Sequence, residues 1–280
     1  MKKQIGIVLT ALLLCSGCQA NQTEQTQGLD EELVSQWEQA FEKLDEQTHY
    51  QTKSEQDGTY ITLSDESQTA LTTKEMHMES VGQVYASDEW TYYFSYGDTC
   101  SLRRENDEVV EEALNFFFHN DELKADEVYF PFTDSDALIY TKYEPQENYD
   151  ITRFRAIKED PTGWSLTKTQ ENGNTILTLK IEDPQAYNDY LGTNEPTQIA
   201  GVDVDKCEVV CNETIIAVDE DGNIVRYESN VETDYGNGLI SHQHYVAEYK
   251  YSDLDAEVFT PQESDQLIEQ AKALQEEIDQ

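Results

Sequence analysis

Residues 172–191, NGNTILTLKIEDPQAYNDYL, combine two patterns that decide the fold class of this 280-residue chain. A turn at 172–174 leads into an alternating run over 176–181, whose leucines share one face as in a half-buried β-strand. Asp183-Pro184 is then typical of a helix start, because aspartate caps the first turn and proline fits its first position. We expect this helix to reach Leu191. A strand followed directly by a short helix favours an α+β fold.

Short runs with a period of two recur along the chain and predict further antiparallel strands. Those before the quoted segment are rich in Tyr and Thr and are separated by turn sequences, which predicts a meander. Those after it include two long runs joined by DEDGN at 219–223. The expected strands are 59–63, 71–80, 89–96 and 99–104, then 163–169, 176–181, 202–218, 224–233 and 239–251.

Helical periodicity appears near both ends of the chain. Residues 29–47 place Leu33, Trp37, Phe41 and Leu44 at spacings of three and four, which predicts an amphipathic helix. Apolar residues at the same spacings predict a second helix at 108–123 and a closing helix at 261–278. The segment 126–161 has three prolines and many turn residues, so we expect it to be irregular.

The first residues have the pattern of a secretory signal peptide. Lys2 and Lys3 precede about ten mostly apolar residues, too few for the roughly twenty that span a bilayer. Ser16-Gly17-Cys18 resembles the bacterial lipobox, with small residues just before the cysteine. This resemblance implies that residues 1–17 are removed and that Cys18 carries a diacylglyceryl group. Cys15 does not fit, because leucines precede it.

Two acyl chains hold a protein on a bilayer stably, so we expect a lipid-anchored protein on the extracytoplasmic face of the cell membrane. Residues 18–28 are polar and without periodicity, which predicts a flexible tether. The chain has 58 acidic and 18 basic residues, a formal charge of −40 that becomes −42 when Lys2 and Lys3 are removed. Such a surface repels phosphate, which excludes nucleic acid as a partner. A hydrophobic content of 38% still allows a packed core.

The lipidated N-terminus, the helix leading into a meander and the segment 176–191 resemble the LolA/LppX-like lipoprotein superfamily, as does the late hairpin at 215–225. The resemblance is one of element order over most of the mature chain. It implies a single domain at 29–280, in which a curved antiparallel β-sheet wraps amphipathic helices as a half-barrel. Known members hold lipid or acyl chains between sheet and helix. The resemblance assigns no binding residue by number.

Three cysteines, Cys100, Cys207 and Cys211, remain after lipidation of Cys18. Residues four apart on one extended strand have Cα atoms about 13 Å apart, whereas a disulfide tolerates about 7 Å. We therefore expect no bond between Cys207 and Cys211, while a bridge from Cys100 to either one stays open.

Two motifs could bind metal, and both have a simpler interpretation. His242 and His244 share one strand face, where zinc would need a further ligand, but a solvated strand face explains them as well. The acidic run 219–223 departs from the EF-hand pattern and fits a hairpin turn. No catalytic signature is found, so we expect neither an enzyme nor a cofactor or metal.

Two classes of function remain. The first is a lipoprotein that binds a lipid or other apolar ligand in a half-barrel cavity. The second is an acidic cell-envelope interaction module that binds a protein partner or cations. For the first class, the expected cavity lining consists of Trp37 and Phe41 on the first helix with Trp90, Tyr92 and Phe94 on the sheet. Core packing also explains these aromatic residues.

Overall fold

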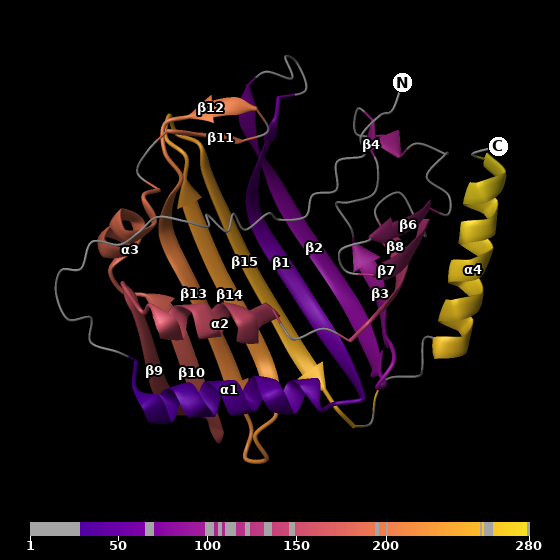
Figure 1. Cartoon of the computed structure of the whole chain (residues 1–280), viewed down its shortest axis with the longest axis horizontal. Helices are drawn as coiled ribbons and strands as arrows, with labels where there is room; N and C mark the ends of the chain where they lie inside the picture. The colour runs from indigo at the N-terminus through magenta and orange to yellow at the C-terminus, as the bar shows by residue number, and fades with distance from the viewer. Residues whose placement is uncertain are drawn as a thin grey trace.

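A computed structural model of the chain contains one large open sheet of eleven antiparallel strands, with helices packed against it (Figure 1). The strand order is β6-β7-β8-β3-β2-β1-β15-β14-β13-β10-β9. Two short pairs, β4–β5 and β11–β12, are separate from this sheet. The structure describes residues 29–64, 70–98, 104–105, 108–109, 116–120, 124–131, 136–145, 149–193, 196–199, 201–252, 254 and 260–278.

The helices are α1 (Glu31–Asp45), α2 (Tyr149–Glu159), α3 (Pro184–Leu191) and α4 (Pro261–Ile278). The strands of the large sheet are β1 (His49–Leu63), β2 (Leu71–Ala86), β3 (Thr91–Asp98), β6 (Phe116–Asn120), β7 (Ala125–Pro131), β8 (Asp136–Tyr143), β9 (Trp164–Glu171), β10 (Asn174–Ile181), β13 (Glu208–Val218), β14 (Ile224–Asp234) and β15 (Ile240–Lys250). The short strands are β4 (Arg104–Glu105), β5 (Glu108–Val109), β11 (Thr197–Ile199) and β12 (Val202–Val204).

Helices pack on both faces of the sheet, at opposite ends. We call the face that contacts α1 and α2 the inner face and the other the outer face. Residues paired directly across neighbouring strands point to the same face of the sheet. Followed from pair to pair, the strand register therefore places Tyr227 of the inner face on the same face as Ser54 of β1, and it places Phe94 on the same face as Gln51 of β1. Because Ser54 and Gln51 are an odd number of residues apart, Phe94 lies on the outer face.

The larger core lies on the inner face between α1, α2 and strands β9, β10, β13 and β14. Figure 1 shows α1 and α2 crossing these strands. Helix α1 is fixed at its start by Asp30, whose carboxylate accepts hydrogen bonds from the backbone amides of Glu32 and Leu33. The buried residues of this core are Val34, Trp37, Ala40, Phe41, Leu44, Ile151, Phe154, Ile157, Trp164, Leu166, Leu177, Leu179, Ile181, Ile216, Val218 and Ile224.

A second packed region lies on the outer face, where α4 covers β6, β7 and β8. Helix α4 begins with a capping box, in which Thr260 and Glu263 exchange side-chain to backbone hydrogen bonds of 2.8 and 3.3 Å. Asp265 ties the helix to the sheet, because it accepts hydrogen bonds from Lys142 Nζ at 2.6 Å and from the Tyr92 hydroxyl at 3.0 Å. The apolar contacts form two clusters, one of Tyr92, Phe94 and Tyr140 and one of Val128, Ile268 and Ala271.

Two glycines mark close backbone approaches in the central strands. A Cβ atom on Gly58 would lie 1.9 Å from the backbone oxygen of His242, and one on Gly97 would lie 2.1 Å from that of Glu79. Both residues have φ near +150°, a region that side-chain-bearing residues rarely adopt. Only glycine fits these two positions, which lie where the β1–β15 and β2–β3 ladders end.

Most expected elements are confirmed. The first helix, the strands at 163–169, 176–181, 224–233 and 239–251, the short helix at 183–191 and the helix at 261–278 all form. The meander is confirmed with longer strands, since β1 begins at His49 and β2 extends to Ala86. The signal peptide expected at 1–17, the tether expected at 18–28 and most of the strand expected at 99–104 lie outside the described residues.

Three expectations about elements are wrong. Where 108–123 is described it forms strands, because the consecutive aromatic residues of β6 pair with β7 and pack Phe117 against α4. The segment 126–161 is mostly regular, with β7, β8 and α2, and Pro131 is tolerated as the last residue of β7. The run 202–218 is divided into β12 and β13, which pair with different strands. Within the described residues, no helix is long and apolar enough to cross a membrane.

Candidate functional site

The central part of the inner face is lined by tyrosines. Alternation along β1, β3, β8, β14 and β15 turns these side chains to one side, together with serines and threonines such as Thr52 and Ser54. All of the tyrosines are half-buried. We call this set the tyrosine face: Tyr50, Tyr93, Tyr143, Tyr227, Tyr245, Tyr249 and Tyr251.

Neighbouring rings of the tyrosine face are close enough to interact. The ring centroid of Tyr50 is 5.9 Å from that of Tyr249 and 6.0 Å from that of Tyr251. The centroids of Tyr227 and Tyr245 are also 6.0 Å apart, with the rings edge to face. These separations are within the 4.5–7 Å range of favourable aromatic pairs. The contacting rings therefore form two groups on the inner face, one of Tyr50, Tyr249 and Tyr251 and one of Tyr227 and Tyr245.

The hydroxyl groups of this surface remain neutral at physiological pH. Burial raises the pKa of Tyr50, Tyr245 and Tyr249, and neighbouring tyrosines raise it further. The Tyr227 hydroxyl donates a hydrogen bond to Asp150 Oδ1 at 3.2 Å, and the Tyr251 hydroxyl donates one to the backbone oxygen of Ile224 at 2.6 Å. Such hydroxyls can donate and accept hydrogen bonds but are poor acids or nucleophiles.

A buried polar network joins the tyrosine face to α2. Arg153 donates hydrogen bonds to Asn212 Oδ1 at 2.6 Å and to Thr214 Oγ1 at 3.4 Å, and its guanidinium lies 5.5 Å from the Trp164 ring centroid. Burial raises the pKa of the neighbouring Asp150 carboxyl, against the opposing effects of Arg153 and Tyr227. The network fixes α2 at the edge of the tyrosine face.

The five residues expected to line a cavity do not lie together. Trp37 and Phe41 are each 1% exposed in the inner-face core, and the Trp37 ring is 5.4 Å from that of Phe154. Phe94, also 1% exposed, and Tyr92 belong to the outer-face core, with Trp90 packed against them. The sheet separates the two groups.

A cleft of about 380 Å³ lies between α1 and the turn after β13. Its lining is mixed, with Gln39, Lys43, Lys168 and residues 219–222 beside the apolar Ala40, Leu177 and Val218. The turn is a closed hairpin rather than a calcium loop, because Asp219 accepts hydrogen bonds from the backbone and side chain of Asn223. Lys43 Nζ also donates to the backbone oxygen of Asp221. None of the five residues expected to line a cavity borders this cleft.

The histidine pair and the cysteines have ordinary partners. His242 Nε2 lies 2.9 Å from Asn230 Oδ1, and His244 Nε2 lies 3.1 Å from Glu228 Oε1, both on the outer face as expected. Cys207 and Cys211 are not joined to each other. Burial raises the pKa of the Cys211 thiol, which makes it a poor nucleophile. Cys18 and Cys100 lie outside the described residues.

No protein-family model matches this chain, and a comparison with curated proteins gives no match. The alternation of Tyr245, Tyr249 and Tyr251 is visible in the sequence, but the sequence does not join these residues to the tyrosines of β1, β3 and β8. The repeated Tyr alternation was the available signal, and the strand order was the missing information.

Proposed function

We propose that this protein is a non-enzymatic, extracytoplasmic lipoprotein that binds a lipid or other amphipathic ligand against the tyrosine face. The observation that supports this most is the set of half-buried tyrosine rings, several of them in contact with one another, on a sheet face that also carries hydroxyl side chains. Rings offer apolar contact area, and phenolic hydroxyls offer hydrogen bonds at the same place. Both are needed to hold a molecule with an apolar tail and a polar head.

The large charge of the protein restricts the ligand further. The full chain has a formal charge of −40 and repels anions, so a neutral or zwitterionic amphiphile suits it better than a free fatty acid. We propose that the open sheet curves as a LolA/LppX-like half-barrel, with the tyrosine face on its concave side. Helix α4 on the outer face is an addition to that pattern.

Anchoring belongs to the same proposal. A diacylglyceryl group on Cys18 and a tether at 18–28 would keep the domain near the bilayer, from which an amphiphile could be taken up. Ten flexible residues span on the order of 18 Å by random-coil scaling. The tether would then keep the domain close to the membrane surface.

A second candidate is an interaction module for a basic envelope protein, and the outer face favours it. The solvent side of the central strands carries an array of exposed acidic residues. These acids would attract a partner by long-range electrostatics, and the association would weaken strongly with added salt. The array includes Glu55, Glu75, Glu79 and Glu248.

Native mass spectrometry of the delipidated protein tests the first candidate. The probe is 1-palmitoyl-lysophosphatidylcholine below its critical micelle concentration, with palmitate as the anionic comparison. Tyr245→Ala should weaken binding about tenfold, since losing a ring contact of roughly 50 Å² costs on the order of 1.4 kcal/mol. Tyr96→Ala is the matched control, because Tyr96 is exposed on the outer face.

Binding of the zwitterionic probe that depends on Tyr245 and not on Tyr96 supports the proposal. Absence of any adduct, or an equal effect of both substitutions, contradicts it. Salt-sensitive capture of a basic protein by the same sample would instead support the second candidate.

A further inference from the structure

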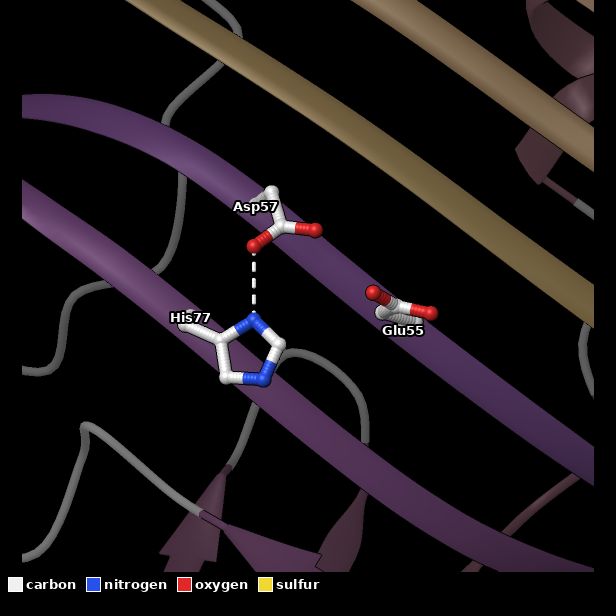
Figure 2. A group of neighbouring side chains, drawn as sticks. All are labelled: Glu55, Asp57 and His77. Carbon is white, nitrogen blue, oxygen red and sulfur yellow. Dashed lines mark hydrogen bonds and ion pairs between the residues drawn. The ribbon is translucent and has the colours of Figure 1, made fainter.

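Two adjacent strands bring an unusual group of side chains together on the outer face. Asp57 of β1 is the register partner of His77 on β2 and of His244 on β15. Glu55 precedes Asp57 by two residues and so lies on the same face. Figure 2 shows Glu55, Asp57 and His77 projecting from the two neighbouring strands toward a common region. None of these residues belongs to the tyrosine face.

The geometry of this group suits a shared ligand. His77 Nδ1 lies 2.6 Å from Asp57 Oδ1, the contact drawn as a dashed line in Figure 2. One ligand atom from each of Glu55, Asp57 and His77 lies within 4.8 Å of the others. A fourth group is near, because Glu79 Oε1 lies 3.7 Å from His77 Nε2. The side chains of His77 and Asp57 are about half exposed, at 52% and 49%, so an ion can reach them.

The pairing of Glu55 with Glu79 points to a cation independently of the histidine. These residues are directly opposite each other in the β1–β2 register, on the same exposed face. Like charges at such positions destabilise a sheet. A divalent ion placed among Glu55, Asp57 and Glu79 would replace this repulsion with attraction.

We propose that Glu55, Asp57 and His77 form a binding site for a divalent transition-metal ion, with Zn²⁺ as the ion that fits best. Two carboxylates and one imidazole are a three-ligand set that zinc accepts, with water in the fourth position. The nitrogen ligand disfavours Ca²⁺, which takes six to eight oxygen ligands. Zinc bonds of about 2.0–2.2 Å require the three side chains to move closer together, which exposed side chains on rigid strands can do.

The proposed ligands already act on one another electrostatically. The hydrogen bond that His77 donates to Asp57, together with the charges of Asp57, Glu79 and Glu55, raises the pKa of His77. The same hydrogen bond lowers the pKa of Asp57, and the charge of His244 on the neighbouring strand lowers it further.

Isothermal titration of the full-length, detergent-solubilised protein with Zn²⁺ tests the site, and Ca²⁺ is the comparison ion. His77→Gln and Glu55→Gln should each weaken zinc binding tenfold or more. His119→Gln is a close control, because His119 Nδ1 makes a similar 2.7 Å contact with a cross-strand partner, Asp126. The His77 ring resonances in NMR spectra should shift on zinc addition, and Tyr245→Ala should leave zinc binding unchanged.

Zinc binding that falls with His77→Gln and Glu55→Gln but not with His119→Gln supports the site. Binding that is equally strong for Ca²⁺, or equally reduced by all three substitutions, contradicts it and indicates a diffuse attraction to the acidic surface. Failure to bind zinc at pH 8 also contradicts the site. Because the lipid probe contacts the other face, these outcomes are separate from those of the ligand experiment.

Discussion

Replacing Phe41 and Phe94 with leucine, singly and together, tests whether the inner-face and outer-face cores are independent. Each ring is 1% exposed. The Phe41 centroid is 5.5 Å from that of Trp37, and the Phe94 centroid is 5.0 Å from that of Tyr140. Leucine has three fewer carbons, which at about 0.8 kcal/mol each gives a loss of about 2.4 kcal/mol, near the lower end of large-to-small core substitutions.

The double variant should lose the sum, about 5 kcal/mol, because the two phenylalanines lie in separate clusters on opposite faces of the sheet. Distant sites add to within about 0.5 kcal/mol. Urea unfolding followed by tryptophan fluorescence gives the three free energies, provided that the dependence on denaturant is unchanged. Trp37→Phe combined with Phe41→Leu is the control, since these contacting rings should show a coupling energy of at least about 0.5 kcal/mol.

A coupling energy above about 1 kcal/mol between Phe41 and Phe94 would refute this reasoning. It would mean that both rings contribute to one packed region or line one cavity. The sequence predicted such a cavity, so the experiment also decides between the predicted arrangement and the observed one.

Further predictions concern the backbone, the exposed ion pair and the anchor. Gly58→Ala should lower the free energy of unfolding by more than the roughly 1–3 kcal/mol of an unfavourable backbone conformation, because the new Cβ would lie 1.9 Å from a backbone oxygen. Gly173→Ala meets open space and should lower it by only about 1–2 kcal/mol. Urea unfolding measures both values. The pKa of His77 is raised in the folded protein, so the contribution of His77 to folding stability is full below pH 6.5 and is lost as the pH rises. The pKa of Asp57 is lowered, so the contribution of Asp57 to folding stability is present above pH 3.8 and is lost as the pH falls. The stability difference between wild type and His77→Gln should therefore be largest between pH 3.8 and 6.5, and a flat difference across pH would contradict the pairing. Intact mass of the membrane-extracted protein should show a diacylglyceryl group on an N-terminal Cys18, and a mature N-terminus at another residue would exclude the lipobox interpretation.

Local sequence patterns were sufficient to predict the helices and strands that have a strong hydrophobic periodicity or a clear capping residue. The helix at 261–278 and the strand–helix segment at 176–191 form as expected, because alternation, capping residues and apolar spacing agree there. At 108–123 they disagree, since apolar residues at helical spacing include three consecutive phenylalanines that pair as β6. Periodicity cannot resolve such short apolar runs, and long-range pairing with β7 decides the outcome.

Function-bearing surfaces were harder to predict, because they depend on strand order. The Tyr245 and Tyr249 alternation was visible in the sequence, yet joining these residues to Tyr50 required the β1–β15 register. Likewise, His77 lies 20 residues from its Asp57 partner, and no spacing rule connects the two. The sequence analysis considered His242 and His244 for metal, whereas the group with the better geometry spans β1 and β2.

The most direct test of ligand binding by the tyrosine face is NMR of the full-length protein with labelled tyrosines and bound 1-palmitoyl-lysophosphatidylcholine. The measured quantity is the nuclear Overhauser effect between acyl-chain protons and tyrosine ring protons. We expect contacts to Tyr50, Tyr93 and Tyr245 and none to Tyr96 on the outer face. Contacts to Tyr96 alone, or no contacts at a saturating concentration of the probe, would contradict ligand binding by the tyrosine face.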